Sequence, residues 1–150
     1  MKVEVQDSIK LKDSIEVIWI FGVKNIDDIW SKNEFGLAVL EGALGVETIL
    51  FYYLLNALSS TEHTTERKRV KEIIEKWTLG TLKEWCASFK LFSGDELKEL
   101  QPLIEERNKI VHDRGYIDRG KTDSSVKGRW EEVVNIAKRF IGKYGTVKVA

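Results

Sequence analysis

The segment NEFGLAVLEGALGVETILFYYLLNALS, residues 33–59, is long and almost wholly apolar. Its hydrophobic residues recur at helical spacing, which predicts one long α-helix with Asn33 as its N-cap and an end near Ser59. At about 100° per residue, seven large residues share one face: Leu37, Leu40, Leu44, Phe51, Leu54, Leu55 and Leu58. We expect this face to lie in the core. Glu47 falls in its middle and Glu41 points elsewhere, so Glu47 needs a partner, because burial of an unpaired carboxylate is costly.

The same segment is long enough to span a bilayer, but inserting Glu41 and Glu47 would cost a few kcal/mol each. We therefore expect a buried helix of a soluble protein, and no membrane partner. The single Cys86 cannot form an internal disulfide, and Met1 is followed by Lys-Val-Glu-Val rather than by an apolar signal core. These features predict a cytoplasmic protein.

The rest of the chain predicts an all-α bundle of four to five helices in one domain. Hydrophobic residues at 43% and charged residues at 32% exclude a disordered chain, and one proline leaves helical spacing largely uninterrupted. Residues 1–32 predict an arm of short strands or irregular structure, packed on the helical domain of residues 33–150. After the first helix we expect helices over about 65–77, 82–92, 102–114 and 125–144, with a break at Gly80, an N-cap at Ser93 or Asp95, and a loop over 118–125.

The stretch EERNKIVHDRGY, residues 105–116, carries the candidate functional residues. On a helix, Arg107 lies in the middle of an apolar face, as Glu47 does on the first helix. The apolar neighbours of Arg107 on that face are Leu100, Leu103, Ile104, Ile110 and Val111. An ion pair between Arg107 and Glu47 would satisfy both charges. Asn108 and His112 continue a polar arc, and His112 lies about 140° from Arg107.

Two interpretations of this arc remain open. A histidine near a helix C-terminus is often a solvated residue, and an arginine below a helix edge is often an ion-pair partner. Alternatively, Arg107 and His112 hold a phosphate that Asn108 helps to orient. Because their tips diverge on one helix, two copies of the helix facing one another would build such a site more easily. His63, in the segment SSTEHTTER, shows no such pattern and is expected at the surface.

The sequence RNKIVH, Arg107 to His112, resembles the signature of the HEPN superfamily, an Arg followed by four to six residues and a His, often with Asn after the Arg. The long first helix with an inward Glu47 and the late position of the motif are similar to that family over about residues 33–144. The resemblance implies a metal-independent endoribonuclease, usually a homodimer with a composite site. Members of that family act in toxin–antitoxin pairs, defence or RNA processing, sometimes with a cognate antitoxin or regulatory protein. Inactive members bind nucleotides or proteins.

The roles implied are those of RNA cleavage through the ribose 2′-OH. His112 would transfer protons, Arg107 would stabilise the phosphorane, Asn108 would orient them, and Glu47 would anchor Arg107. The net charge is zero, so RNA must be attracted locally; residues 107–129 hold seven Lys and Arg against three Asp. Within that basic segment we expect RNA-backbone contacts from Lys109, Arg114, Arg119 and Lys121, and base stacking on Tyr116. Some toxins of the family carry a Tyr two residues after the His, where this chain has Arg114.

Other chemistries have less support. The sequence has no Cys/His spacing suited to a metal, no glycine-rich phosphate loop and no serine nucleophile motif, so we expect neither a metal nor a cofactor. The segment GALGVE predicts close-packing glycines. Cys86 and most Trp and Phe residues are expected in the core, and Trp30 at the surface or an interface. An inactive binding module is the main alternative to a nuclease, and an immunity or antitoxin protein is a third.

Overall fold

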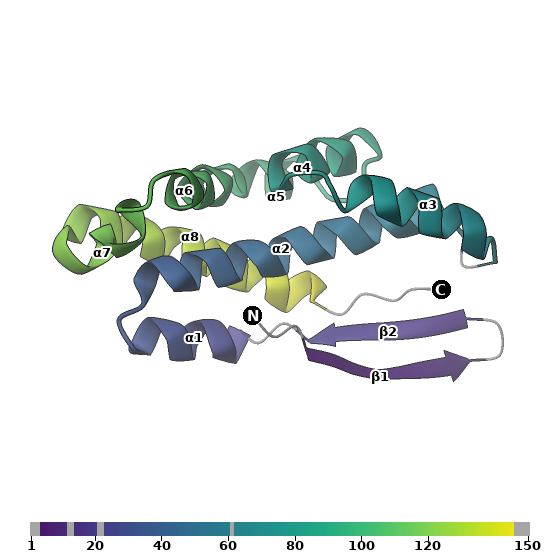
Figure 1. Ribbon diagram of the computed structural model, residues 1–150, viewed down its shortest axis with the longest axis horizontal. Helices are drawn as coiled ribbons and strands as arrows, with labels where there is room; N and C mark the ends of the chain where they lie inside the picture. The colour runs from purple at the N-terminus through teal and green to yellow at the C-terminus, as the bar shows by residue number, and fades with distance from the viewer. Residues whose placement is uncertain (1–3, 12–13, 21–22, 61, 146–150) are drawn as a thin grey trace.

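The structure is a computed structural model that describes residues 4–11, 14–20, 23–60 and 62–145, with the backbone only for the first two ranges. From Val23 to Tyr144 its regular elements are helices, which confirms the predicted all-α character of this part. Helix α2 (Phe35–Leu58) runs through the middle of the molecule, and most of the other helices surround it (Figure 1). It packs against α1, α3, α4, α6 and α8, so it is the central element of the fold.

The other helices are α1 (Val23–Ser31), α3 (Thr64–Ile74), α4 (Leu79–Ser88), α5 (Gly94–Glu99), α6 (Gln101–His112), α7 (Arg119–Thr122) and α8 (Ser124–Tyr144), with a 3-10 turn η1 (Tyr116–Asp118). The predicted number of four to five helices is not confirmed, because the short α1, α5 and α7 add to the long ones. The segment predicted as an arm contains α1 and an antiparallel pair of strands, β1 (Glu4–Leu11) and β2 (Ser14–Ile20), with a register shift between Gln6 and Ile9.

The buried face of α2 only partly matches the one that we expected from the sequence. Most of its buried residues are small or β-branched: Gly36, Ala38, Val39, Gly42, Ala43, Gly45, Val46 and Ile49, together with Phe35, Leu50, Leu54 and Leu55. Leu37 is 40% exposed, and Leu40, Leu44 and Phe51 are only half-buried. The prediction is confirmed for Leu54 and Leu55, which are buried, but not for Leu37. Because α2 is apolar nearly all round, helical angles alone do not determine its core side.

Close approach of helices explains which side of α2 was chosen. A Cβ atom added at Gly42 would lie 2.8 Å from the Cβ of Ala137 on α8, which is closer than two such atoms pack. The glycine therefore lets α2 and α8 meet almost backbone to backbone, as the segment GALGVE predicted. Two turns before Ala137 on α8, Trp130 is fully buried, and its indole N–H has no hydrogen-bond partner among the described residues.

Two of the local signals for helix ends are confirmed, and others are wrong. The Ser93 hydroxyl accepts a hydrogen bond from the Glu96 N–H at 3.1 Å and caps α5, and Pro102 lies in the first turn of α6. Asn33 is not the N-cap of α2: Glu34 takes that position, and Asn33 has φ 62° in the turn from α1. The loop expected over 118–125 is mostly helical, because η1, α7 and the start of α8 occupy it.

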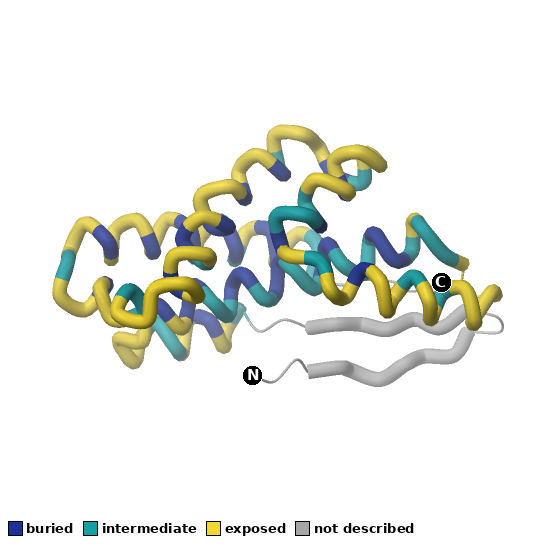
Figure 2. The backbone as a smooth tube through the Cα atoms, turned by 45° about the horizontal axis from the view of Figure 1, so that its top comes forward, coloured by how far each residue is buried: buried dark blue, intermediate teal, exposed yellow. Residues whose placement is uncertain are grey.

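The aromatic residues divide differently from the prediction. Cys86 is buried as expected, with burial raising the pKa of its thiol to about 12. Trp30 is half-buried and packs against Phe35 at 4.6 Å between ring centroids. Trp85 and Phe89, which we expected in the core, are 42% and 44% exposed. Figure 2 shows that α2 and one side of α8 carry much of the buried surface, whereas most of α3 is exposed.

By length and composition, α2 is apolar enough to cross a membrane, and no other helix among the described residues is. Half of its most apolar window is buried against the rest of the protein. A core helix of a soluble protein passes the same test, so the burial of α2 accounts for its composition without a bilayer.

The close contact at Gly42 predicts opposite effects of two glycine-to-alanine substitutions. Gly42→Ala should lower the free energy of unfolding by about 1–3 kcal/mol, because the new methyl group overpacks against Ala137. Gly128→Ala on α8 has open space around it and should raise stability by about 0.5–1 kcal/mol through helix propensity. Urea unfolding monitored by circular dichroism measures both, and a stabilised Gly42→Ala protein would contradict the proposed packing.

Candidate functional site

Helix α6 presents its polar residues at three levels of burial. Glu106 is 4% exposed, Arg107 is half-buried, and Asn108 and His112 are exposed. The sequence placed Arg107 at the centre of the buried face of α6. In the structure, the buried face is centred closer to Glu106, a fraction of a helical turn away. Val111, expected on the same face, is accordingly half exposed. The buried charge of α6 is therefore a glutamate and not the arginine.

Glu106 is held by a group of residues that we call the Glu106 cluster: Glu106, Lys109, Tyr116 and Arg129. The Tyr116 hydroxyl donates to Glu106 Oε1 at 2.8 Å, and Arg129 Nε donates to the same oxygen at 3.2 Å. Lys109 Nζ lies 3.1 Å from Glu106 Oε2. Arg129 also donates to the Tyr116 hydroxyl at 3.2 Å, so the cluster ties α6, η1 and α8 together.

The electrostatics of Glu106 reflect this arrangement. Burial is the largest single influence and by itself raises the pKa of the carboxyl, but hydrogen bonds from Tyr116, Lys109 and Arg129 outweigh it. The pKa of Glu106 therefore lies below its ordinary value, and the group stays ionised in the protein interior. Lys109 and Tyr116 were expected at an RNA strand; here both bond to Glu106, and the Tyr116 ring also meets Trp130 edge to face.

Arg107 and Glu47 lie close enough to interact electrostatically but do not form the predicted direct ion pair. The described residues contain no contact within 4.0 Å between their charged atoms. Burial raises the pKa of Glu47, and the charge of Arg107 lowers it by a smaller amount. Arg107 instead donates from Nη1 to the Asn108 Oδ1 at 3.0 Å. The guanidinium is thus oriented by its neighbour and keeps donors available.

His112 is the last residue of α6 and is exposed. Arg107 and His112 lie five residues apart, so their side chains leave the helix in directions about 140° apart. The structure therefore places Asn108 beside Arg107, and it leaves His112 on a different side of α6. Within one chain, these three side chains belong to a single helix, and none of them is among the described residues that line the cavities at α2–α4 and α5–α8.

The remaining basic residues of the sequence prediction lie beyond α6. Lys121 bonds to Glu34 at 3.3 Å and lies 3.7 Å from Asp118 Oδ1, so its charge is partly neutralised. Arg119 is exposed and contributes to a lowered pKa of Asp123, where hydrogen bonds from Ser125 and Val126 dominate. Arg114 is exposed just after α6. Arg114 and Arg119 are the exposed arginines nearest to His112 in the sequence.

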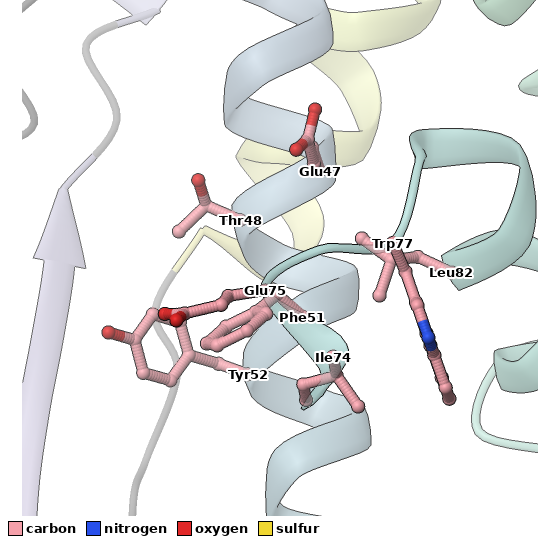
Figure 3. A pocket seen from close by; sticks show the side chains of 8 residues that line it. All are labelled: Glu47, Thr48, Phe51, Tyr52, Ile74, Glu75, Trp77 and Leu82. Atoms are coloured by element: carbon pink, nitrogen blue, oxygen red, sulfur yellow. The ribbon is translucent and has the colours of Figure 1, made fainter. Parts of the chain in front are cut away.

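A cavity of about 260 Å³ lies beside this region, between α2 and the connection from α3 to α4. Figure 3 shows Glu47 and Thr48 projecting from α2 on one side, with Trp77 and Leu82 on the other. Phe51 and Tyr52, whose rings meet edge to face, also line it. Glu47 links this cavity to the motif, because it lines the cavity and its carboxyl feels the charge of Arg107, while no residue of α6 is part of the lining.

The described residues contain no group of three or more His, Cys, Asp or Glu side chains arranged to hold a metal ion. No family model matches this chain, and comparison with curated proteins and with solved structures found no similar protein. The functional argument therefore depends on the residues themselves.

The sequence did not reveal the Glu106 cluster. Lys109 at three residues after Glu106 is a local signal for an ion pair on a helix, and it could have been noticed. The contact with Arg129 spans 23 residues and depends on how α8 packs against α6. No periodicity within either helix indicates that contact.

Removing the charge of Glu106 tests the cluster. Glu106→Gln should lower the free energy of unfolding at about pH 7 by about 1–3 kcal/mol, because three donors lose their charged acceptor. Because the pKa of Glu106 is depressed on folding, its contribution is present above the ordinary carboxyl pKa and is lost as pH falls through the folded value. The difference between wild type and variant should therefore shrink at about pH 3. Urea titrations at both pH values measure it; a difference that grows in acid would contradict the assignment.

Proposed function

We propose that the protein is a metal-independent endoribonuclease of the HEPN type that cleaves single-stranded RNA. The observation that carries the proposal is the arrangement on α6: Arg107 is held by Asn108 at 3.0 Å, and His112 is exposed at the helix end. The buried charge of α6 is Glu106, whereas Asn108 and His112 are exposed, so packing does not explain the presence of these two residues. The pattern matches the Arg-to-His signature described above.

These side chains have the chemistry that RNA cleavage requires. The ribose 2′-oxygen attacks the phosphorus while its proton moves to a base, and the bond to the 5′-oxygen breaks as that oxygen is protonated. An imidazole is suited to carry these protons near neutral pH, and we assign this role to His112. A guanidinium donates several hydrogen bonds to the added charge of the phosphorane, a role for Arg107. The products would be a 2′,3′-cyclic phosphate and a free 5′-hydroxyl.

In a homodimer, Arg107 of one protomer and His112 of the other could face the same phosphate, although the two side chains point in different directions within one chain. The α2 stripe, which we define as Leu37, Leu40, Leu44 and Phe51, is a row of large apolar side chains that are half-buried or exposed. On α6, Val111 is a further exposed apolar residue, one turn after Arg107. A second copy placed on the stripe would bury it and bring two α6 helices toward each other. A cytoplasmic toxin, defence or RNA-processing enzyme with a cognate antitoxin or regulatory protein would fit such a dimer.

The second candidate is an inactive module of the same type that binds a nucleotide or a protein. One observation favours it. Lys109, Tyr116 and Lys121, expected to follow an RNA strand, all contact other residues of the chain. A nuclease would then depend on Arg114, Arg119 and other surfaces to hold its substrate.

Cleavage in EDTA separates the two candidates. Wild type should cleave unstructured single-stranded RNA, and His112→Ala should reduce the rate by about 10²–10⁴-fold because proton transfer is lost. Arg107→Ala should reduce it by about 10²–10³-fold. His63→Ala, a surface histidine at the start of α3, is the matched control and should cleave normally. Wild type that cleaves no RNA of diverse sequence, or activity that survives in both variants, would exclude the nuclease.

The dimer is tested by a charge on the α2 stripe. Leu44→Arg should convert a dimer into a monomer, because the charged side chain would have to be desolvated in the interface. Light scattering coupled to size-exclusion chromatography measures the mass of wild type and variant. Lys24→Glu, on an exposed position of α1, is the control and should not alter the mass. A monomeric wild type at high concentration would contradict the composite site.

A further inference from the structure

Three aromatic rings are stacked at the surface of α4 and the turn before it. We call Trp77, Trp85 and Phe89 the aromatic ladder. The ring centroids of Trp77 and Trp85 are 5.3 Å apart with planes at 20°, and those of Trp85 and Phe89 are 5.9 Å apart at 24°. Trp85 and Phe89 are more than two-fifths exposed. Such rings are seldom left in water without a use.

The surroundings of the aromatic ladder are polar and basic. On α4, Thr81 lies one turn before Trp85 and Ser88 adjoins Phe89, while the exposed Glu84 and Lys90 flank the two rings in the sequence. Lys76 precedes Trp77 and is exposed, and Arg69 on α3 is exposed as well. Over residues 64–90 the chain has seven Lys and Arg against four Glu, a surplus of three in a protein whose net charge is zero.

We propose that the aromatic ladder is a stacking platform for unpaired bases of a single-stranded RNA, with Arg69 and Lys76 contacting its phosphates. Because Trp85 is stacked between the other two rings, the outer faces of Trp77 and Phe89 are the surfaces on which bases of any sequence can stack, and a basic margin holds the backbone of the strand. A surface that binds a protein partner typically presents apolar side chains of varied shape. This surface instead combines planar rings, neutral hydroxyls and positive charge. The inference rests on the proposed function and names the path of its substrate.

The aromatic ladder is also connected to the motif. Trp77 lines the same cavity as Glu47, and the charge of Arg107 acts on Glu47. A strand stacked on the ladder would therefore pass beside the cavity on its way to Arg107. Glu47 and Glu75, which also line the cavity, would repel phosphates there. The backbone of the strand is thus kept away from these two carboxylates, with the bases toward the rings.

Binding is measured separately from cleavage in the full-length His112→Ala protein, with a fluorescently labelled short oligouridine as the probe. Adding Trp85→Leu and Phe89→Leu together should weaken RNA binding by about tenfold or more, since the bases lose the rings on which they stack. Trp85→Phe with Phe89→Tyr keeps both rings and should bind within about twofold of the parent. Arg69→Gln with Lys76→Gln should weaken binding and flatten its salt dependence. The matched charge control Lys24→Gln with Lys32→Gln on and beside α1 should do neither.

A second measurement does not depend on the leucine variant folding. In the His112→Ala protein, oligouridine should shift the indole N–H resonances of Trp77 and Trp85 and leave that of the buried Trp130 in place. Unchanged resonances, or equal affinity of the leucine and aromatic variants, would overturn the proposal. So would a folded leucine variant that changes from dimer to monomer, which would make the ladder a protein interface. If the aromatic ladder is needed for RNA binding but wild type cleaves no RNA, the proposed nuclease activity is rejected and the stacking platform stands. If wild type cleaves RNA and the ladder variants bind RNA as well as the parent, the platform is rejected and the nuclease stands.

Discussion

The fold depends on the close approach of α2 and α8 at Gly42 and Ala137. A glycine opposite an alanine lets the two helix backbones come together, and the small and β-branched face of α2 then forms the centre of the core. Burying this face turns the opposite side of α2, with Leu37 and Leu44, toward the surface. One packing contact thereby creates the apolar stripe on which the proposed dimer depends.

A second constraint sets the orientation of α6. The buried carboxylate of Glu106 requires the donors of Tyr116, Lys109 and Arg129, and this requirement fixes the rotation of α6 against α8. Removing one member would leave a buried charge without its full set of partners. With Glu106 turned inward, Asn108 and His112 face the solvent. The buried Glu106 and the exposed Asn108 and His112 therefore occupy different sides of the same helix, with the half-buried Arg107 between them.

The sequence predicts most helices because their signals are local. The apolar run of α2, the Ser93 cap and Pro102 each act within a few residues, and the structure contains them where they were expected. The core side of α2 was not predictable, since an almost uniformly apolar helix has no preferred face before its neighbours are placed. The candidate site was found through the spacing of Arg107 and His112, which is also local. The burial of Glu106 through Arg129, and the exposure of Trp85, depend on which helices meet in space.

The proposed function assigns the chemistry to the ribose 2′-OH, and a single atom tests it. The preferred cleavage site of wild type is first mapped in EDTA on an all-ribose RNA, and the nucleotide on its 5′ side is then replaced by its 2′-deoxy form. Our account predicts that cleavage at that bond stops, while the remaining cleavage products carry 2′,3′-cyclic phosphates and 5′-hydroxyls. Cleavage of the substituted bond at an unchanged rate, with 5′-phosphate products, would contradict the role of Arg107 and His112.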